Sequence, residues 1–173
     1  MGKQDFPGAI RAPQFHPVGT HREYLAHGPE AGEERSVTVS VIIPCRNEGS
    51  FIVPCLESIL WNDYPPDEME VLVADGGSSD GTRERIAELA QKYGNLRMME
   101  NPDQIIPCAL NRMLRAARGR YILRFDAHSL MPPGYIRQCV ELLERTGAWC
   151  AGGVCVTRPR GDSPMAEIGR AHV

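Results

Sequence analysis

The chain has 173 residues, a formal net charge of −3 and a hydrophobic content of 42%, which suffices for one domain with a buried core. The slightly acidic balance and the lack of a basic block disfavour nucleic acid as a partner. No apolar run approaches the ~20 residues of a membrane-spanning helix, and the N-terminus lacks the apolar core of a secretory signal. Six cysteines without a CxxC pair predict free thiols in a reducing compartment, so we expect a cytoplasmic protein.

The N-terminal part differs in pattern from the rest of the chain. Residues 1–36 contain Gly, Pro and His without apolar periodicity, and they are predicted to form a largely disordered extension. From residue 37 onward, apolar or alternating segments have the length of buried strands. Five such strands are predicted, at residues 37–44, 69–74, 96–99, 120–125 and 148–156.

A segment with helical apolar spacing follows each of the first four predicted strands. Ser50 is the expected N-cap of the first helix, and Gly94 is expected to end the second. The third is expected to open at Pro107 and to end at Gly119, and the fourth follows Pro132-Pro133. Alternation of strand and helix indicates βαβ units, so the predicted fold class is α/β, with a mostly parallel, Rossmann-like sheet and helices on both faces.

Three predicted strands end in polar sequence: Cys45-Arg46-Asn47-Glu48 after the first, DGGSSDGT (75–82) after the second, and Asp126-Ala127-His128 after the fourth. Polar residues are common in turns, so each stretch alone is a weak signal. Parallel strands place all three at one edge of the sheet, where α/β proteins bind ligands. We therefore predict a ligand site at this edge.

The turn at 75–82 offers specific chemistry. Asp75 can accept hydrogen bonds from a base or a ribose, whereas Asp80 suits the cap of the following helix. Neither GxGxxG nor GxxxxGK[ST] is present, which disfavours a nicotinamide-dependent dehydrogenase and a P-loop NTPase. Without such a loop, a bound diphosphate needs another counter-charge, and a metal ion held by Asp126 would supply it.

Four segments in this order carry a resemblance to a known family: VSVIIPCRNEGSFIVPCLESIL, VLVADGGSSDGTRERI, NPDQIIPCALNRMLRAARGRYILRFDAH and AGGV. Over roughly residues 37–155 the chain resembles the inverting glycosyltransferases of the large family 2 type, which have the GT-A fold. Within that family it is similar to the bacterial enzymes of succinoglycan-type exopolysaccharide synthesis. The resemblance implies that residues 37–157 form a nucleotide-sugar-binding domain for a donor, expected to be a UDP-sugar, and that the acceptor is a glycan or is lipid-linked.

The resemblance also implies site residues by position. Nucleotide-binding roles fall on Pro44, Arg46, Glu48, Asp75, Asn111, Arg112, Arg124 and Asp126. Arg124 shares a strand face with Asp126, so it can either reach a phosphate or pair with an acid such as Glu48. Asp126 matches the first acid of the family's Asp-x-Asp metal motif, and His128 stands where the second acid usually is.

Two interpretations of His128 stay open: it ligates a metal with Asp126, or it is a strand-end histidine that caps a turn or faces solvent. As a ligand pair, Asp126 and His128 favour Mn²⁺ over Mg²⁺, because manganese accepts imidazole more readily.

The family's catalytic base comes from a later, acceptor-binding half, and Asp162 and Glu167 lie in no recognisable motif of that kind. We therefore expect residues 158–173 to begin a truncated acceptor-side segment, the base to lie beyond Val173, and the sheet to be incomplete at the C-terminus. Segments beyond Val173 would also provide any attachment to the cytoplasmic face of a membrane. The competing interpretation is a nucleotide-binding module, or a truncated product, without turnover. A sugar nucleotidyltransferase is disfavoured, because PCRNEGS is not a basic glycine-rich loop.

Overall fold

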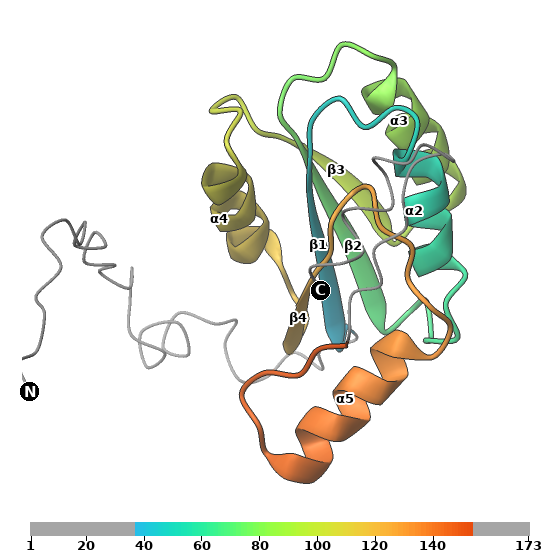
Figure 1. Ribbon diagram of the computed structural model, residues 1–173, viewed down its shortest axis with the longest axis vertical. Helices are drawn as coiled ribbons and strands as arrows, with labels where there is room; N and C mark the ends of the chain where they lie inside the picture. The colour runs from blue at the N-terminus through green and yellow to red at the C-terminus, as the bar shows by residue number, and fades with distance from the viewer. Residues whose placement is uncertain (1–36, 154–173) are drawn as a thin grey trace, which may run out of the picture. The chain divides into compact units, whose positions relative to one another are not determined.

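The computed structural model describes residues 37–153, which contain a four-stranded sheet. Its strands are β1 (Val39–Cys45), β2 (Met69–Asp75), β3 (Leu96–Glu100) and β4 (Tyr121–Arg124). All pairings are parallel, and the strand order is β3-β2-β1-β4 (Figure 1). The order grows from β1 through β2 to β3 and then returns to the other side of β1, so the topological switch point lies between β1 and β4.

Helices cover both faces of the sheet, as predicted. One face packs against α2 (Ile52–Leu60), α3 (Thr82–Lys92) and α5 (Tyr135–Thr146), and the other packs against α4 (Ile106–Ala116) (Figure 1). β1 is apolar on both sides because helices cover both of its faces. Val41 and Ile43 pack in the core under α2, α3 and α5, whereas Ile42 packs in the core under α4. The predicted α/β fold class is therefore confirmed. None of the helices within residues 37–153 is long and apolar enough to cross a membrane.

Two local predictions were wrong. The N-cap of α2 is Phe51 and not Ser50, and no side chain makes a capping hydrogen bond there. The predicted fifth strand at 148–156 forms no strand over its described part, 148–153, and the remainder lies outside the described residues. A strand needs a neighbouring backbone to pair with, and no described strand pairs with residues 148–153; the two glycines there also weaken a strand. The expected N-terminal extension and the segment 158–173 also lie outside the described residues.

A buried carboxylate, that of Glu70, fixes the start of β4 at the amino-terminal ends of the strands. Glu70 is 1% exposed and accepts hydrogen bonds from Ser40 Oγ (2.7 Å), from the backbone N–H of Arg118 (2.6 Å) and from the side chains of Arg118 and Arg97. The Ser40 hydroxyl in turn accepts the backbone N–H of Gly119 at 2.8 Å. A Cβ atom at Gly119 would lie 2.4 Å from the Ser40 nitrogen, so only glycine permits this approach. This cluster fixes the start of β4, the strand that leads to Asp126.

Candidate functional site

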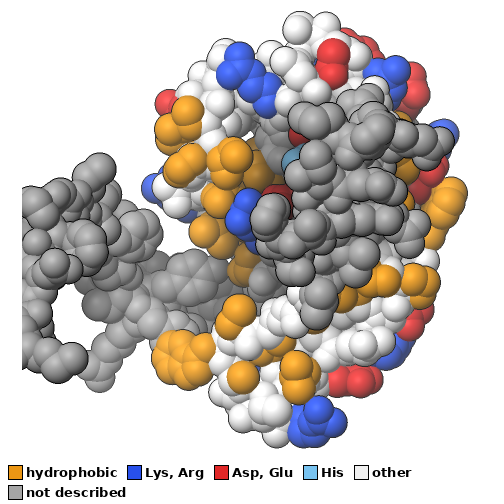
Figure 2. Space-filling view, viewed as in Figure 1, with side chains coloured by type: hydrophobic (Ala, Val, Ile, Leu, Met, Phe, Trp, Pro, Cys, Tyr) orange, Lys and Arg blue, Asp and Glu red, His pale blue; other side chains and the backbone are white. Residues whose placement is uncertain are grey.

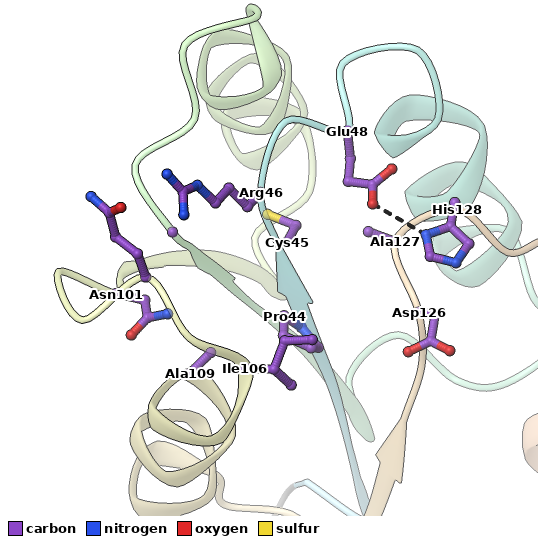
Figure 3. Close-up of a pocket in the computed structure, with 12 residues that line it drawn as sticks. Pro44, Cys45, Arg46, Glu48, Asn101, Ile106, Ala109, Asp126, Ala127 and His128 are labelled. Carbon is purple, nitrogen blue, oxygen red and sulfur yellow. Dashed lines mark hydrogen bonds and ion pairs between the residues drawn. The ribbon is translucent and has the colours of Figure 1, made fainter.

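A pocket of about 170 Å³ opens at the carboxyl ends of β1 and β4, which is the switch point of the sheet (Figure 3). It collects residues from the turns after β1, β2, β3 and β4 and from the first turn of α4. Its lining residues are Pro44, Cys45, Arg46, Glu48, Gly76, Asn101, Gln104, Ile106, Ala109, Asp126, Ala127 and His128. Five residues predicted from the sequence are therefore brought together here: Pro44, Arg46, Glu48, Asp126 and His128.

The charged side of the pocket consists of two paired carboxylates. His128 Nδ1 lies 3.1 Å from Glu48 Oε1 (Figure 3), and Arg124 donates to Asp126 Oδ1 at 3.0 Å. Arg124 thus pairs with Asp126 and not with Glu48. Asp126 and His128 have side chains that are 51% and 61% exposed, so both are accessible to a ligand. When Nδ1 carries the proton that is donated to Glu48, Nε2 keeps a lone pair.

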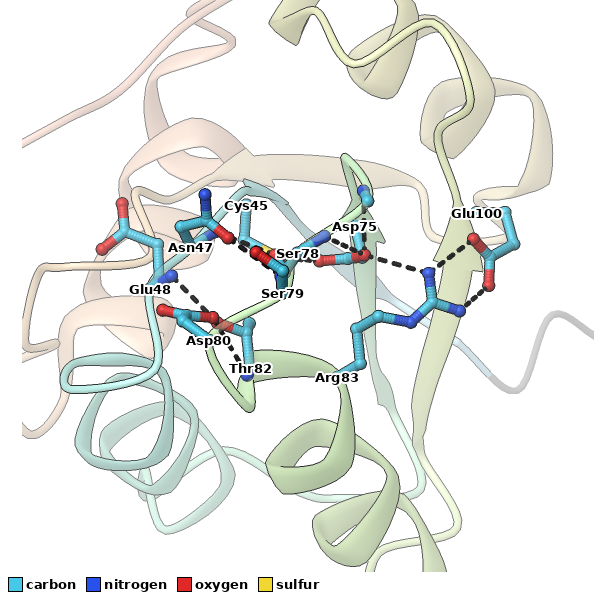
Figure 4. A network of polar contacts seen from close by, with 11 residues as sticks. Cys45, Asn47, Glu48, Asp75, Ser78, Ser79, Asp80, Thr82, Arg83 and Glu100 are labelled. Atoms are coloured by element: carbon cyan, nitrogen blue, oxygen red, sulfur yellow. Dashed lines mark hydrogen bonds and ion pairs between the residues drawn. The ribbon is translucent and has the colours of Figure 1, made fainter.

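Asp75 has a different environment from the one the sequence suggested. Its carboxylate is fully buried and accepts hydrogen bonds from the backbone N–H groups of Gly77 (3.0 Å) and Ser78 (3.1 Å), from the Ser78 hydroxyl and from Arg83 (3.3 Å) (Figure 4). Arg83 also pairs with Glu100. Asp75 does not line the pocket, and in this arrangement it holds the 75–82 turn in shape.

The 75–82 turn braces the loop that carries Glu48. Asp80 accepts the backbone N–H of Gly49 at 2.8 Å and that of Thr82 at 3.2 Å. The Thr82 hydroxyl accepts the N–H of Glu48 at 2.9 Å (Figure 4). Hydrogen bonds from the Thr82 hydroxyl and from the Gly49 N–H lower the pKa of Asp80. The N-cap position of α3 is Gly81, and Asp80 instead joins the 75–82 turn to the loop after β1 by hydrogen bonds. The position of Glu48 therefore depends on contacts across more than 30 residues of sequence.

The opposite wall is uncharged and was not predicted. Asn101 and Gln104 lie in the turn between β3 and α4, and the Gln104 amide lies beside Gly77. Asn101 holds this turn: its N–H donates to the Asp75 carbonyl (2.8 Å), its carbonyl accepts the Gln104 N–H (3.0 Å), and its side chain donates to the Ile105 carbonyl (3.1 Å). Their sequence signal was the polar stretch Asn-Pro-Asp-Gln directly after a predicted strand, on the same edge as the other three turns.

Asn111 and Arg112 do not line the pocket. They lie on α4, where Arg112 pairs with Asp103 at 2.9 Å and Asn111 is exposed. Helical spacing explains this placement, because Ala109 and Met113 face the sheet. α4 contributes Ile106 and Ala109 to the pocket instead. Figure 2 shows apolar side chains gathered on the side of the molecule where α4 lies in Figure 1.

The donor set sets limits on a metal ion. Within residues 37–153, no group of three or more His, Cys, Asp or Glu side chains is placed to hold one. Asp126 nevertheless keeps one carboxylate oxygen without a hydrogen bond in the described part of the chain, and His128 keeps Nε2. These residues fit an ion that takes one or two ligands from the protein and the rest from phosphates and water.

An open parallel sheet with a polar pocket at its switch point has the architecture in which α/β proteins bind ligands. Residues 40–171 match the family described as Glycosyl transferase family 2, and the chain belongs to that family. The predicted family is thereby confirmed.

Curated relatives support the same family. The chain is 37% identical over 118 residues to the succinoglycan biosynthesis protein ExoA of Rhizobium meliloti (strain 1021), a match that covers 67% of this chain and 36% of that protein. It is 32% identical over 109 residues to a dolichyl N-acetyl-alpha-D-glucosaminyl phosphate 3-beta-D-2,3-diacetamido-2,3-dideoxy-beta-D-glucuronosyltransferase of Methanococcus voltae, covering 62% and 34%. The chain spans about a third of the length of these relatives.

Solved structures agree on the fold. The mannosyltransferase PcManGT from Pyrobaculum calidifontis, in complex with GDP-Man and Mn²⁺, has a TM-score of 0.58 at 30% identity, covering 70% of this chain and 37% of that one. TarS 1–349 of S. aureus, in complex with UDP-GlcNAc, has a TM-score of 0.58 at 24% identity, covering 64% and 32%. The second match shows a shared fold.

Proposed function

We propose that this chain provides the donor-binding part of a glycosyltransferase that transfers a sugar from a UDP-sugar to a glycan or lipid-linked acceptor in polysaccharide synthesis. The observation that carries the proposal is the pocket at the switch point, which joins Arg46, Glu48, Asp126 and His128 in a chain of glycosyl transferase family 2. Two structural neighbours have GDP-Man or UDP-GlcNAc in their names, and one relative is named for succinoglycan biosynthesis. These names support a nucleotide-sugar donor.

Asp126 and His128 would hold a divalent cation, Mn²⁺ in preference to Mg²⁺, because a carboxylate and an imidazole suit manganese. When bound, such an ion neutralises charge that develops on the departing diphosphate. Glu48 would orient the His128 ring by accepting a hydrogen bond from its Nδ1–H, and Arg124 would orient the Asp126 carboxylate. Arg46 and Arg124 would also offer positive charge to the phosphates.

The remaining parts of the reaction follow from the same proposal. Transfer would invert the anomeric centre by direct displacement, with a general base that deprotonates the acceptor hydroxyl. We propose that this base belongs to a part of the enzyme without a counterpart in residues 37–153, since the relatives are about three times as long as the matched region. Asp75 would act on the nucleotide indirectly, by holding the 75–82 turn.

Calorimetry with the 173-residue chain tests the proposal. We expect UDP to bind in the presence of Mn²⁺, to bind more weakly with Mg²⁺, and to bind poorly without a divalent ion. Asp126→Asn should abolish the metal dependence. Asp67→Asn is the matched control, because Asp67 is exposed and lies outside the pocket.

Metal-independent UDP binding, or equal binding by Asp126→Asn, would contradict the metal assignment. A preference for GDP over UDP would contradict the proposed donor base. An assay of sugar release from UDP-sugars, with and without candidate acceptors, separates an enzyme from a nucleotide-binding module without turnover.

A further inference from the structure

The pocket has two chemically different walls. Glu48, Asp126 and His128 form a charged wall at the ends of β1 and β4, whereas Asn101 and Gln104 present neutral amides at the turn after β3. Figure 3 shows Asn101 and the pair Asp126 and His128 on opposite sides, with Pro44 and Arg46 between them. A ligand with one ionic end and one neutral hydrogen-bonding end therefore has a preferred orientation in this pocket.

Gln104 differs from the other amide on this wall. The Asn101 side chain is 3% exposed and donates to the Ile105 carbonyl, so it is part of the turn. The Gln104 side chain is exposed at the pocket, and its carboxamide makes no hydrogen bond within residues 37–153. It therefore has a donor and an acceptor available for a ligand.

The backbone at Gln104 has an unusual conformation that neighbouring contacts maintain. Its φ is 58°, in the left-handed region that glutamine rarely adopts, and its N–H is held by the Asn101 carbonyl at 3.0 Å. Gly77 allows the close approach of this side chain, since a Cβ there would lie 3.3 Å from Gln104 Nε2. An unfavourable conformation that surrounding contacts maintain beside a pocket indicates a functional constraint.

We infer that Gln104 is a binding residue for the nucleobase of the donor, so that the base lies against the β3–α4 turn and the diphosphate lies against Asp126. This inference rests on the proposed function. The Watson–Crick edge of a base presents a donor next to an acceptor, and a carboxamide complements that pair without placing a charge beside the ring. The reverse orientation would place the carboxylates of Glu48 and Asp126 beside the base, and it would move the diphosphate away from Asp126 and His128. Asp75 is buried and already accepts hydrogen bonds from Gly77, Ser78 and Arg83, so it does not compete for this role.

The test compares UDP with inorganic pyrophosphate, both in the presence of Mn²⁺, by calorimetry on the full chain. Gln104→Ala removes the amide and keeps a side chain with an unfavourable φ, whereas Gln104→Gly removes the amide and relieves the backbone. Both variants should bind UDP roughly tenfold more weakly, the loss expected for one or two neutral hydrogen bonds. Pyrophosphate affinity should stay within about twofold in the same comparison, because it does not reach the amide wall. Gln91→Ala, at an exposed site on α3, is the matched control and should bind both as the original chain does.

Three results would overturn the inference. Unchanged UDP affinity in both variants would make Gln104 a bystander. An equal loss for UDP and pyrophosphate would assign it to the general shape of the pocket. A loss in Gln104→Ala that Gln104→Gly does not share would assign the effect to the backbone. These outcomes leave the proposed function intact, whereas failure of the unsubstituted chain to bind UDP with Mn²⁺ would defeat the proposed function and this inference together.

Discussion

Glu70→Gln is the substitution that most directly tests how the sheet fixes the start of β4. Glutamine keeps the shape of the side chain, and its oxygen can still accept from Ser40 Oγ and the Arg118 N–H, which lie 2.7 and 2.6 Å from Glu70 Oε1. The new amide N–H₂ would replace Oε2, which now accepts from Arg97 at 3.2 Å and from Arg118 Nε at 3.1 Å. The substitution would therefore remove two charge-assisted hydrogen bonds, and the new amide N–H₂ would face the N–H donors of Arg97 and Arg118.

The magnitude follows from the burial of each partner. A hydrogen bond to a charged group contributes about 1.5–3 kcal/mol, but the Arg97 and Arg118 side chains are 49% and 62% exposed, and solvent screening reduces each contribution to about 1 kcal/mol. We expect a total loss of about 2 kcal/mol at pH 7, which lowers Tm by roughly 4–8 °C for a chain of this size. Glu88→Gln makes the same charge change at an exposed site on α3 and should leave Tm unchanged.

The pH dependence gives an independent check. Burial raises the pKa of Glu70, but hydrogen bonds from the Arg118 N–H and the Ser40 hydroxyl and the charge of Arg118 outweigh it, so the net pKa is lowered. A carboxyl group with a lowered pKa in the folded state stabilises the fold above its unfolded pKa of about 4.3, and this contribution is lost as pH falls through the folded pKa. The difference in unfolding free energy between the original chain and Glu70→Gln should therefore narrow below about pH 4.

Urea unfolding followed by circular dichroism at pH 7 and at pH 3.5–5 measures both effects, over a range of pH chosen around the reference value of ~4.3. Equal stability of the two chains at pH 7 would show that the carboxylate charge contributes nothing. A difference that stays constant as pH falls would show that the loss comes from packing and not from ionisation.

Three further predictions concern single side chains. Gly119→Ala should lower the free energy of unfolding by about 1–3 kcal/mol in thermal melts, because the new Cβ would lie 2.4 Å from the Ser40 nitrogen. The control is Gly94→Ala, which has no atom within 4 Å and should be neutral or stabilising by up to about 1 kcal/mol. Equal effects of the two substitutions would contradict the close approach at Gly119. Burial, and then the neighbouring Asp75 carboxylate, raises the pKa of Cys45 to about 12. Iodoacetamide at pH 8 should therefore label the exposed Cys150 before Cys45 in a mass-spectrometric time course, and labelling of Cys45 before Cys150 would refute this. His128→Ala should leave Tm unchanged because the side chain is 61% exposed, and it should weaken Mn²⁺-dependent UDP binding; unchanged metal dependence would favour the solvent-facing interpretation.

The sequence by itself determined the elements and the edge of the sheet where the pocket lies. Apolar runs of strand length, each followed by helical spacing, require a parallel sheet with helices on both faces, because each apolar face must be covered. Polar residues at the ends of the first and fourth strands must then meet at one edge. Arg46, Glu48, Asp126 and His128, which follow these two strands, line one pocket. The apolar composition of 148–156 predicted a fifth strand, but residues 148–153 form none, because a strand also needs a backbone to pair with.

The tertiary structure alone decided how these residues are paired and which others join them. Asp75 is sealed by its own turn and by Arg83, and Arg124 binds Asp126 in preference to Glu48. Gln104 enters the pocket through a left-handed backbone conformation. Each outcome depends on the approach of segments that are distant in sequence, or on competition among several donors for one acceptor. Local periodicity carries no information about either, since it specifies which face a side chain occupies and not which partner it meets there.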